Sequence, residues 1–279
     1  MDADAYRRES RRRWGESAAG WKRRDAFVGR AAMPVSAWLV DALELQPGHR
    51  VLELAAGTGE VGLLAHELIQ PGGELILSDF APEMLTAAQE RAEARGLRGV
   101  RFKQIDAESI DLDAASLDGV LCRWGYMLMA DPGAALRETR RVLRPGGRVA
   151  LAAWTGPEDN PWSALIGREL VNRGAWEPPD PEEPGQFAWA EEGVVGRLLA
   201  EAGFADVEVD VVAFENRYAS FEDWIASQRD LSPRTDEALR TRPDAGEILE
   251  ALRVAAAPYE REDGSVVMPA RTWVAVAEA

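Results

Sequence analysis

The chain has 279 residues, of which 46% are hydrophobic and 29% are charged, as is typical of a soluble globular protein with one substantial core. A net charge of −16 argues against duplex DNA or RNA as the main partner, because phosphate binding depends largely on lysine and arginine. The single cysteine, Cys122, excludes an internal disulfide and is expected in the core; two histidines are too few for most histidine metal sites, so we expect no bound metal.

The N-terminal segment, residues 2–27, predicts a locally basic helix that carries Trp14 and Trp21. It lacks the apolar region of a signal peptide, and no stretch of the chain approaches the roughly 18 continuous apolar residues of a membrane span, so we expect a cytoplasmic protein. The plain interpretation of this segment is a solvated amphipathic helix, with a membrane-surface role as a weaker alternative. A second helix is expected over residues 34–45, ending before Pro47.

A glycine-rich turn follows the apolar run at residues 51–54, with glycines at positions 57, 59 and 62. Apolar residues then recur at helical spacing, so the pattern predicts a strand, a tight turn and a helix over residues 59–69. Glycine permits unusual φ angles and close approach of a ligand to the backbone, and the helix that follows offers unpaired N–H groups. We therefore expect a polar ligand at this turn.

Strands and helices alternate after the turn, which is typical of a parallel sheet covered on both faces. Further strands are expected at residues 74–79, 100–106, 117–124 and 148–154. Helices are expected after Pro82 and after Pro132, since proline is favoured at the first helical position. The sequence thus predicts an α/β fold with a doubly wound, mostly parallel sheet.

The C-terminal part of the chain mixes this pattern with two irregular regions. Residues 155–190 hold six prolines among aromatic residues, so we expect an irregular insertion with one short helix at residues 162–173. The remaining expected elements are a helix at 191–202, a strand at 207–214, helices at 221–229 and 245–256 within a second insertion at 215–265, and a closing antiparallel strand over 266–277.

Three acidic residues lie on the first three expected strands. Glu53 lies inside the first strand, Asp79 ends the second and Asp106 ends the third. Ligands of open α/β sheets bind at the carboxyl ends of the strands, where these acids and the glycine-rich turn meet. Asp79 also suits the ribose-binding acid of a nicotinamide-dependent enzyme. Glu53 disfavours that alternative, because a nicotinamide-binding strand normally carries an apolar residue there.

Together, Glu53-x-x-x-Gly57-x-Gly59, Asp79, Asp106-Ala107 and the later run from Leu143 to Arg148 (LRPGGR) resemble the class I S-adenosylmethionine-dependent methyltransferases, nearest to the ubiquinone/menaquinone-biosynthesis type. The resemblance covers residues 45–155 closely and the remainder in outline. It implies S-adenosyl-L-methionine as cofactor and a Rossmann-like, seven-stranded sheet. It also implies an N-terminal helical cap at residues 1–45 that acts as a lid, and a methyltransferase domain at residues 46–279 whose insertions after strands 5 and 6, at 155–190 and 215–265, cover the substrate.

The resemblance also suggests roles for individual residues. Asp79 would bind the ribose hydroxyls, Asp106 the adenine amino group, and Glu53 with the loop backbone the methionine ammonium. The full expected cofactor site is Glu53, Ala55, Gly57, Thr58, Gly59, Asp79, Phe80, Met84, Asp106, Ala107, Glu108 and Arg123. The expected acceptor contacts are Trp124, Tyr126, Trp154 and Trp162, with ordinary core aromatics as the alternative interpretation. In this picture Trp14 or Trp21 would shield the sulfonium.

No catalytic residue is assigned from the sequence. His66 lies away from the apolar stripe of its expected helix, so we expect it to face solvent, and His49 precedes the first strand at the far end of the sheet. The favoured function is methyl transfer to a small, largely apolar or aromatic molecule such as a quinone, phenol, lipid or secondary metabolite. An NAD-dependent oxidoreductase and a cofactor-binding relative without methyl transfer remain alternatives. The oligomeric state stays open, with a homodimer as one alternative.

Overall fold

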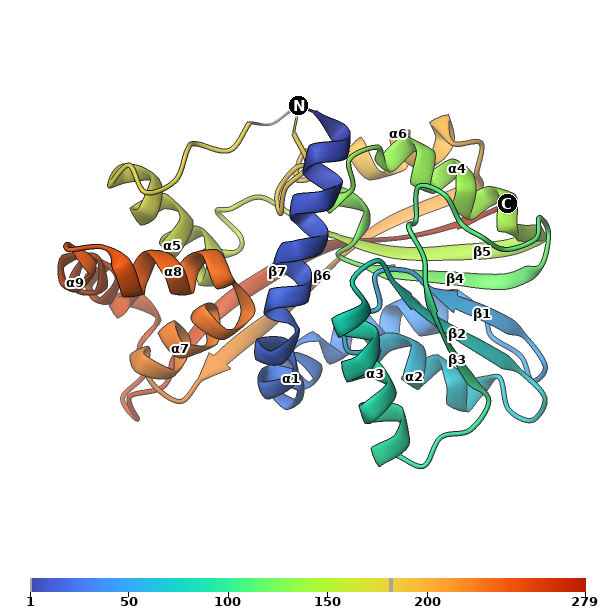
Figure 1. The fold of residues 1–279 in the computed structure, drawn as a ribbon, viewed down its shortest axis with the longest axis horizontal. Coiled ribbons are helices and arrows are strands. Elements are labelled where there is room, and N and C mark those ends of the chain that lie inside the picture. Colours follow the sequence, from blue (N-terminus) through green and yellow to red (C-terminus); the bar gives the residue numbers. More distant parts are fainter. Residues whose placement is uncertain (1, 181–182) are drawn as a thin grey trace.

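We describe the protein from a computed structural model that covers residues 2–180 and 183–279; residue 1 of the expected cap and residues 181–182 of the expected first insertion lie outside the described residues. Within them, seven strands form one sheet in the order β3-β2-β1-β4-β5-β7-β6 (Figure 1). The strands are β1 (Arg50–Glu53), β2 (Glu74–Asp79), β3 (Val100–Gln104), β4 (Leu117–Arg123), β5 (Leu143–Trp154), β6 (Ala205–Tyr218) and β7 (Val266–Glu278).

Strands β1 to β5 are parallel, and β7 runs antiparallel between β5 and β6. The register places Leu52 of β1 beside Ile76 of β2 and Val120 of β4, all in the core. The strand order reverses between β1 and β4, which makes their carboxyl ends the expected ligand crevice. The prediction of a doubly wound, mostly parallel sheet with an antiparallel closing strand is confirmed.

Helices cover both faces of the sheet. The second half of α1 (Ala3–Ala42), α2 (Glu60–Leu68) and α3 (Pro82–Ala94) bury their apolar side chains on one face. On the other face lie α4 (Pro132–Val142) and α6 (Val194–Glu201). Cys122 of β4 is fully buried in this second core, as expected.

The long strands β6 and β7 extend beyond the other strands of the sheet, toward a separate group of helices on the left of Figure 1. These are α5 (Pro161–Asn172), α7 (Phe221–Leu231), α8 (Pro233–Thr241) and α9 (Ala245–Ala256). They share an apolar core around Leu170, Trp224, Ile248, Leu252 and Met268. The sequence predicted α5, α7 and α9 but missed α8, although Ser232 accepts a hydrogen bond from the Thr235 N–H and Pro233 starts the helix.

The expectation of two N-terminal helices is wrong, because α1 is one continuous 40-residue helix that runs through Pro34. A proline inside a helix removes one backbone hydrogen bond. Here Val35 and Leu39, which follow it on one side of the helix, are completely buried against the sheet, and that packing holds the helix together across the interruption.

Helix α1 stands between the sheet and the C-terminal helices (Figure 1). Its backbone approaches α7 so closely at Gly20 that a Cβ atom there would lie 1.7 Å from the Asp230 carbonyl oxygen. Arg23 and Arg24 bind the Asp230 carboxylate at 2.6 and 2.7 Å. None of the helices in the described ranges combines the length and the apolar character that a bilayer crossing needs.

Candidate active site

The loop after β1 turns sharply before α2 begins at Glu60. Ala55, Gly57 and Gly59 have φ angles of 49°, 54° and 75°, in the left-handed region that glycine adopts most easily. The Gly59 position also leaves no room for a side chain, because a Cβ atom would lie 2.8 Å from Leu77 Cδ1 of β2. The loop is therefore packed tightly on the neighbouring strand, with its backbone at the carboxyl edge of the sheet.

Asp79, at the end of β2, lies against this loop. One carboxylate oxygen accepts the Gly57 N–H at 3.0 Å and the other accepts the Ala81 N–H at 2.9 Å. Burial raises the pKa of Asp79 to about 6, although hydrogen bonds from the backbone N–H groups of Ala81, Gly57 and Phe80 oppose the shift. The carboxyl group expected to bind ribose is thus fixed beside the glycine-rich loop and is mostly ionised at neutral pH.

Glu53 lies beneath the same loop and is 2% exposed. Its Oε2 accepts the Gly62 N–H at 2.8 Å, and glycine is needed there because a Cβ atom would lie 2.6 Å from that oxygen. Burial raises the pKa of Glu53 to about 8, so the carboxyl group is mostly protonated at neutral pH. Its expected contact with an ammonium group stays a prediction.

Residues 106–108 form a turn after β3. The Asp106 carboxylate accepts the Glu108 N–H at 3.0 Å, and Ala107 is buried. The Glu108 carboxylate accepts hydrogen bonds from Arg7 Nε at 3.0 Å and from the Asp131 N–H at 3.1 Å. Because Arg7 belongs to α1, Glu108 ties the N-terminal helix to the turn that carries Asp106.

Two tryptophans of α1 cover the residues that follow Asp79. Trp14 and Trp21 lie with their ring centroids 5.9 Å apart and pack, together with Phe80, against a buried group that includes Met84. The structure therefore brings the two expected apolar cofactor contacts, Phe80 and Met84, under the helix that was expected to act as a lid.

Arg123, at the end of β4, forms hydrogen bonds and a cation-π contact with neighbouring side chains. It donates hydrogen bonds to Glu60 Oε2 at 2.5 Å and to Ser36 Oγ at 2.6 Å, and its guanidinium lies 4.8 Å from the Trp124 ring centroid. Sequence reasoning missed Ser36, because a serine in the middle of a distant helix carries no signal of its partner. The expected role of Arg123 at the cofactor stays a prediction.

Three of the expected acceptor residues come together at the ends of β4 and β5. Trp124 stacks on Trp154 with centroids 4.1 Å apart, and Trp162 lies 5.0 Å from Trp154. Phe214 of β6 joins them at 6.1 Å from Trp154, a member that sequence reasoning missed. We call Trp124, Trp154, Trp162 and Phe214 the aromatic cluster.

Trp124 itself has a φ of 60°, which is strained for a bulky residue and persists only where the surroundings hold it. Its indole N–H donates to Thr272 Oγ1 at 2.9 Å. The next residue, Gly125, brings β4 against the glycine-rich loop, since a Cβ atom there would lie 2.8 Å from Ala55 Cβ. The residue that follows Trp124 thus lies against the loop.

Tyr126 lies apart from this cluster in the short 3-10 helix η1 (Tyr126–Leu128). It is 1% exposed, its hydroxyl lies 2.6 Å from Thr139 Oγ1 of α4, and its ring stacks on Trp189. This placement matches the alternative interpretation of a core aromatic. A contact with the acceptor stays a prediction.

The expectation that His66 faces solvent is wrong. Its side chain is buried, with Nε2 at 2.8 Å from the Arg98 carbonyl oxygen. The loop between α3 and β3 covers this side of α2, and helical periodicity alone could not reveal that. His66 lies near the C-terminal end of α2, whereas the glycine-rich loop precedes the other end.

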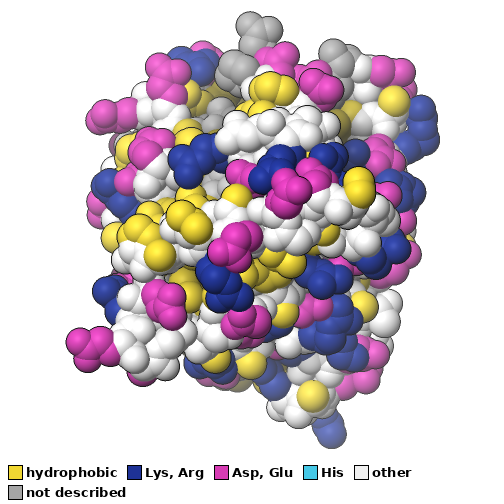
Figure 2. All heavy atoms as spheres, turned by 90° about the vertical axis from the view of Figure 1, so that its left-hand side faces the viewer, with side chains coloured by type: hydrophobic (Ala, Val, Ile, Leu, Met, Phe, Trp, Pro, Cys, Tyr) yellow, Lys and Arg dark blue, Asp and Glu magenta, His cyan; other side chains and the backbone are white. Residues whose placement is uncertain are grey.

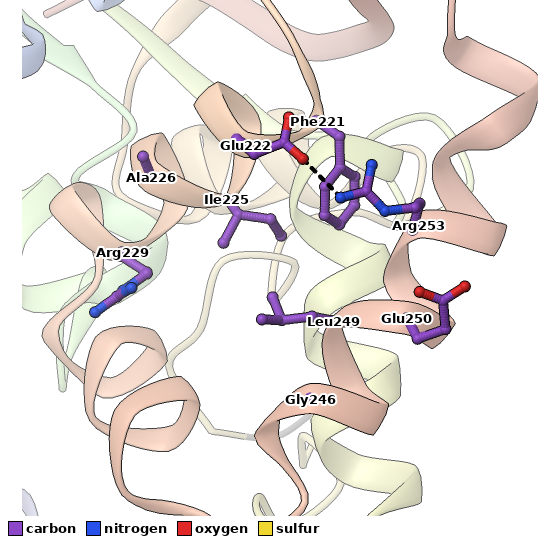
Figure 3. A pocket seen from close by; sticks show the side chains of 9 residues that line it. All are labelled: Phe221, Glu222, Ile225, Ala226, Arg229, Gly246, Leu249, Glu250 and Arg253. Atoms are coloured by element: carbon purple, nitrogen blue, oxygen red, sulfur yellow. Dashed lines mark hydrogen bonds and ion pairs between the residues drawn. The ribbon is translucent and has the colours of Figure 1, made fainter.

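A separate hollow of about 320 Å³ lies between α7 and α9 (Figure 3). Its lining combines apolar side chains with an ion pair between Glu222 and Arg253 at 2.6 Å. Figure 2 shows the end of the molecule that carries these helices, where hydrophobic and charged side chains are interspersed. The hollow belongs to the C-terminal helices, so it is distinct from the acids at the ends of β1 to β3.

Comparisons with known proteins identify similar sequences and similar folds. A methyltransferase-domain family model matches residues 45–167. The demethylmenaquinone methyltransferase of Thermus thermophilus is 43% identical over 116 residues, which cover 42% of this chain and 51% of the relative. The chain therefore spans about half the length of this curated relative.

Two further similarities extend over more of the chain. An uncharacterized protein of Mycobacterium tuberculosis is 30% identical over 204 residues, covering 72% of this chain and 71% of that protein. The crystal structure of the YcgJ protein from Bacillus subtilis superimposes with a TM-score of 0.60 at 21% identity, covering 87% of this chain and 97% of that one. At 21% sequence identity, the structural similarity supports a shared fold alone.

Proposed function

Because the chain belongs to the class I S-adenosylmethionine-dependent methyltransferases, we propose that it transfers a methyl group from S-adenosylmethionine to a small, largely apolar or aromatic molecule. The observation that carries this proposal is the position of Asp79, which is buried against the glycine-rich loop. That loop follows β1, where the strand order reverses.

The residues at the ends of β1 to β3 suit the cofactor. In this proposal the Asp79 carboxylate exchanges its backbone partners for the two ribose hydroxyls, and Asp106 with the Ala107 backbone binds adenine. Phe80 and Met84 supply apolar contact, and the loop backbone at residues 55–59 binds the methionine end. Arg123 and Glu108 are proposed to act through the contacts they make with α1 as well as with the cofactor.

Methyl transfer needs little covalent chemistry from the protein. When bound, S-adenosylmethionine supplies an electrophilic methyl group on a sulfonium. The protein's task is to align the acceptor and to exclude water, and a base is needed only if the acceptor must lose a proton. Helix α1, which lies over Phe80 and Met84, and the segment at residues 155–190 are proposed to close the site.

The acceptor half of the site is proposed to be the aromatic cluster. Indole and phenyl faces favour planar or apolar molecules, such as a quinone, a phenol or a lipid. The net charge of −16 makes a nucleic-acid acceptor a poor fit.

Incubation of the purified protein with methyl-labelled cofactor and a panel of quinone, phenol, amine and fatty-acid acceptors tests the proposal. We expect label transfer to an aromatic or apolar member of the panel. Binding of the cofactor with no transfer to any member would favour a relative that uses the fold without methyl transfer. Reduction of an acceptor by NADH in the same panel would favour the oxidoreductase.

A further inference from the structure

One side chain of α1 reaches the glycine-rich loop. Within residues 55–59 only Thr58 has a polar side chain, and its hydroxyl lies 3.0 Å from Asp25 Oδ1 of α1. Arg91 of α3 completes the group, since its Nη1 lies 2.6 Å from the same Asp25 oxygen and 3.3 Å from Thr58 Oγ1. We call Asp25, Thr58 and Arg91 the loop clasp.

The loop clasp is partly withdrawn from water. Thr58 is 9% exposed, and the side chains of Arg91 and Asp25 are 13% and 29% exposed. Burial lowers the pKa of Arg91, and the Asp25 carboxylate opposes that shift. Hydrogen bonds to a charged group in such surroundings are stronger than those between neutral groups, so the clasp holds the Thr58 hydroxyl firmly.

A second ion pair at the same helix interface provides a contrast. Lys22, one turn before Asp25 on α1, pairs with Glu90, the residue before Arg91 on α3. These two side chains are 58% and 50% exposed. Exposed pairs of this kind contribute little, and in the described part of the chain neither side chain forms a hydrogen bond or an ion pair with the loop.

We propose that Asp25 is a positioning residue for the cofactor loop, acting through Thr58. The glycines that flank Thr58 can adopt many backbone conformations, and Ala55 has a strained left-handed one, so the loop needs outside support to keep a single conformation. Asp25 supplies that support from α1, so the N-terminal helix orders the loop as well as covering it. The inference rests on the proposed function to the extent that the loop binds the cofactor.

Binding of S-adenosylhomocysteine, measured by calorimetry on the full chain, tests the inference together with amide hydrogen exchange of the free protein. We expect Asp25→Ala to weaken binding about tenfold and to speed exchange in residues 55–59 without ligand. Asp25→Asn, which keeps an acceptor oxygen but loses the charge, should show smaller changes in both measurements. It replaces the alanine variant if that variant folds poorly. Lys22→Ala is the matched control and should behave as wild type.

A double-mutant cycle separates positioning from general stability. If Asp25 acts through Thr58, the variant Asp25→Ala/Thr58→Val should bind no more weakly than Thr58→Val alone. Additive losses, or Asp25 variants with wild-type binding and exchange, would overturn the inference. Wild-type protein that binds no S-adenosylhomocysteine would contradict the proposed function, and the exchange of the free loop would still decide the role of Asp25.

Discussion

The two halves of the sheet's carboxyl edge differ in chemistry. The ends of β1 to β3 present carboxyl groups that bond to nearby backbone N–H groups, as Asp79 does with Gly57 and Ala81. The ends of β4 to β6 and the start of α5 present the aromatic cluster, in which Trp124 is held by Thr272, 148 residues further along the chain. Local loops and contacts from α1 arrange the first half, whereas packing between distant segments arranges the second.

This difference indicates how a single edge can serve two ligands. Fixed carboxylates and backbone amides suit a polar ligand with a constant donor pattern, whereas stacked indoles suit an apolar molecule of variable shape. Gly125 joins the halves, because its backbone lies against Ala55 of the glycine-rich loop. Because the two halves use different side chains, changes in one half should alter one ligand and spare the other.

The largest effect is expected in the polar half. Asp79→Ala removes the charge-assisted acceptor for the ribose hydroxyls, and cofactor binding measured by calorimetry should weaken by about 2 to 3 kcal/mol. Asp111→Ala, whose side chain is 92% exposed, is the control and should bind as wild type. Unchanged affinity in the Asp79 variant would mean that this carboxylate does not bind the cofactor.

A pH-dependent effect is expected from Glu53. Its pKa rises from 4.5 to about 8 on folding, so the folded protein keeps a proton that the unfolded chain loses in that range. This contribution to stability is complete below about pH 4.5 and is lost as the pH rises to about 8. Glu53→Gln cannot lose the proton, so its stability relative to wild type should increase with pH, by at most about 1.4 kcal/mol per unit.

Urea unfolding at several pH values between 4.5 and 8 measures this difference. Glutamine retains an oxygen that can accept the Gly62 N–H, so the local hydrogen bond is conserved. Parallel stability curves for the variant and wild type would show that Glu53 is ionised in the folded protein.

A smaller effect is expected in the aromatic half. Trp124→Phe loses the hydrogen bond to Thr272 and part of the stack on Trp154, and should raise the acceptor KM by a factor that corresponds to about 1 kcal/mol. Cofactor affinity should stay as in wild type. The control is Trp38→Phe, because Trp38 packs on the sheet from the second half of α1 and is not a member of the aromatic cluster. An equal rise in KM for both variants would show that the aromatic cluster contributes no more to acceptor binding than an aromatic residue of the core.

The same division explains what the sequence could predict. The order of elements, the end of β2 at Asp79 and the glycine-rich turn follow from local patterns, so the sheet was predicted almost strand by strand. The burial of His66 and the continuity of α1 through Pro34 depend on tertiary packing, which local periodicity does not encode. Helix α8 was missed despite a local signal, the Ser232-Pro233 start.

Local sequence patterns could not predict the contacts of α1 either. Asp25 reaches Thr58 across 33 positions, and Arg7 reaches Glu108 across 101. A basic helix with two tryptophans predicted a cover for the site, but no spacing rule pairs such residues. Their partners emerge only when the helix is placed against the sheet.

Thermal unfolding with S-adenosylhomocysteine and, separately, with NADH tests the central claim most directly, that the polar half of this edge binds a methyl-donor cofactor. A ligand that binds only the folded state stabilises it by about 2.7 kcal/mol at 100 times its Kd. We predict a rise in Tm with S-adenosylhomocysteine, a much smaller rise in Asp79→Ala, and none with NADH. A rise with NADH and none with S-adenosylhomocysteine would contradict the account.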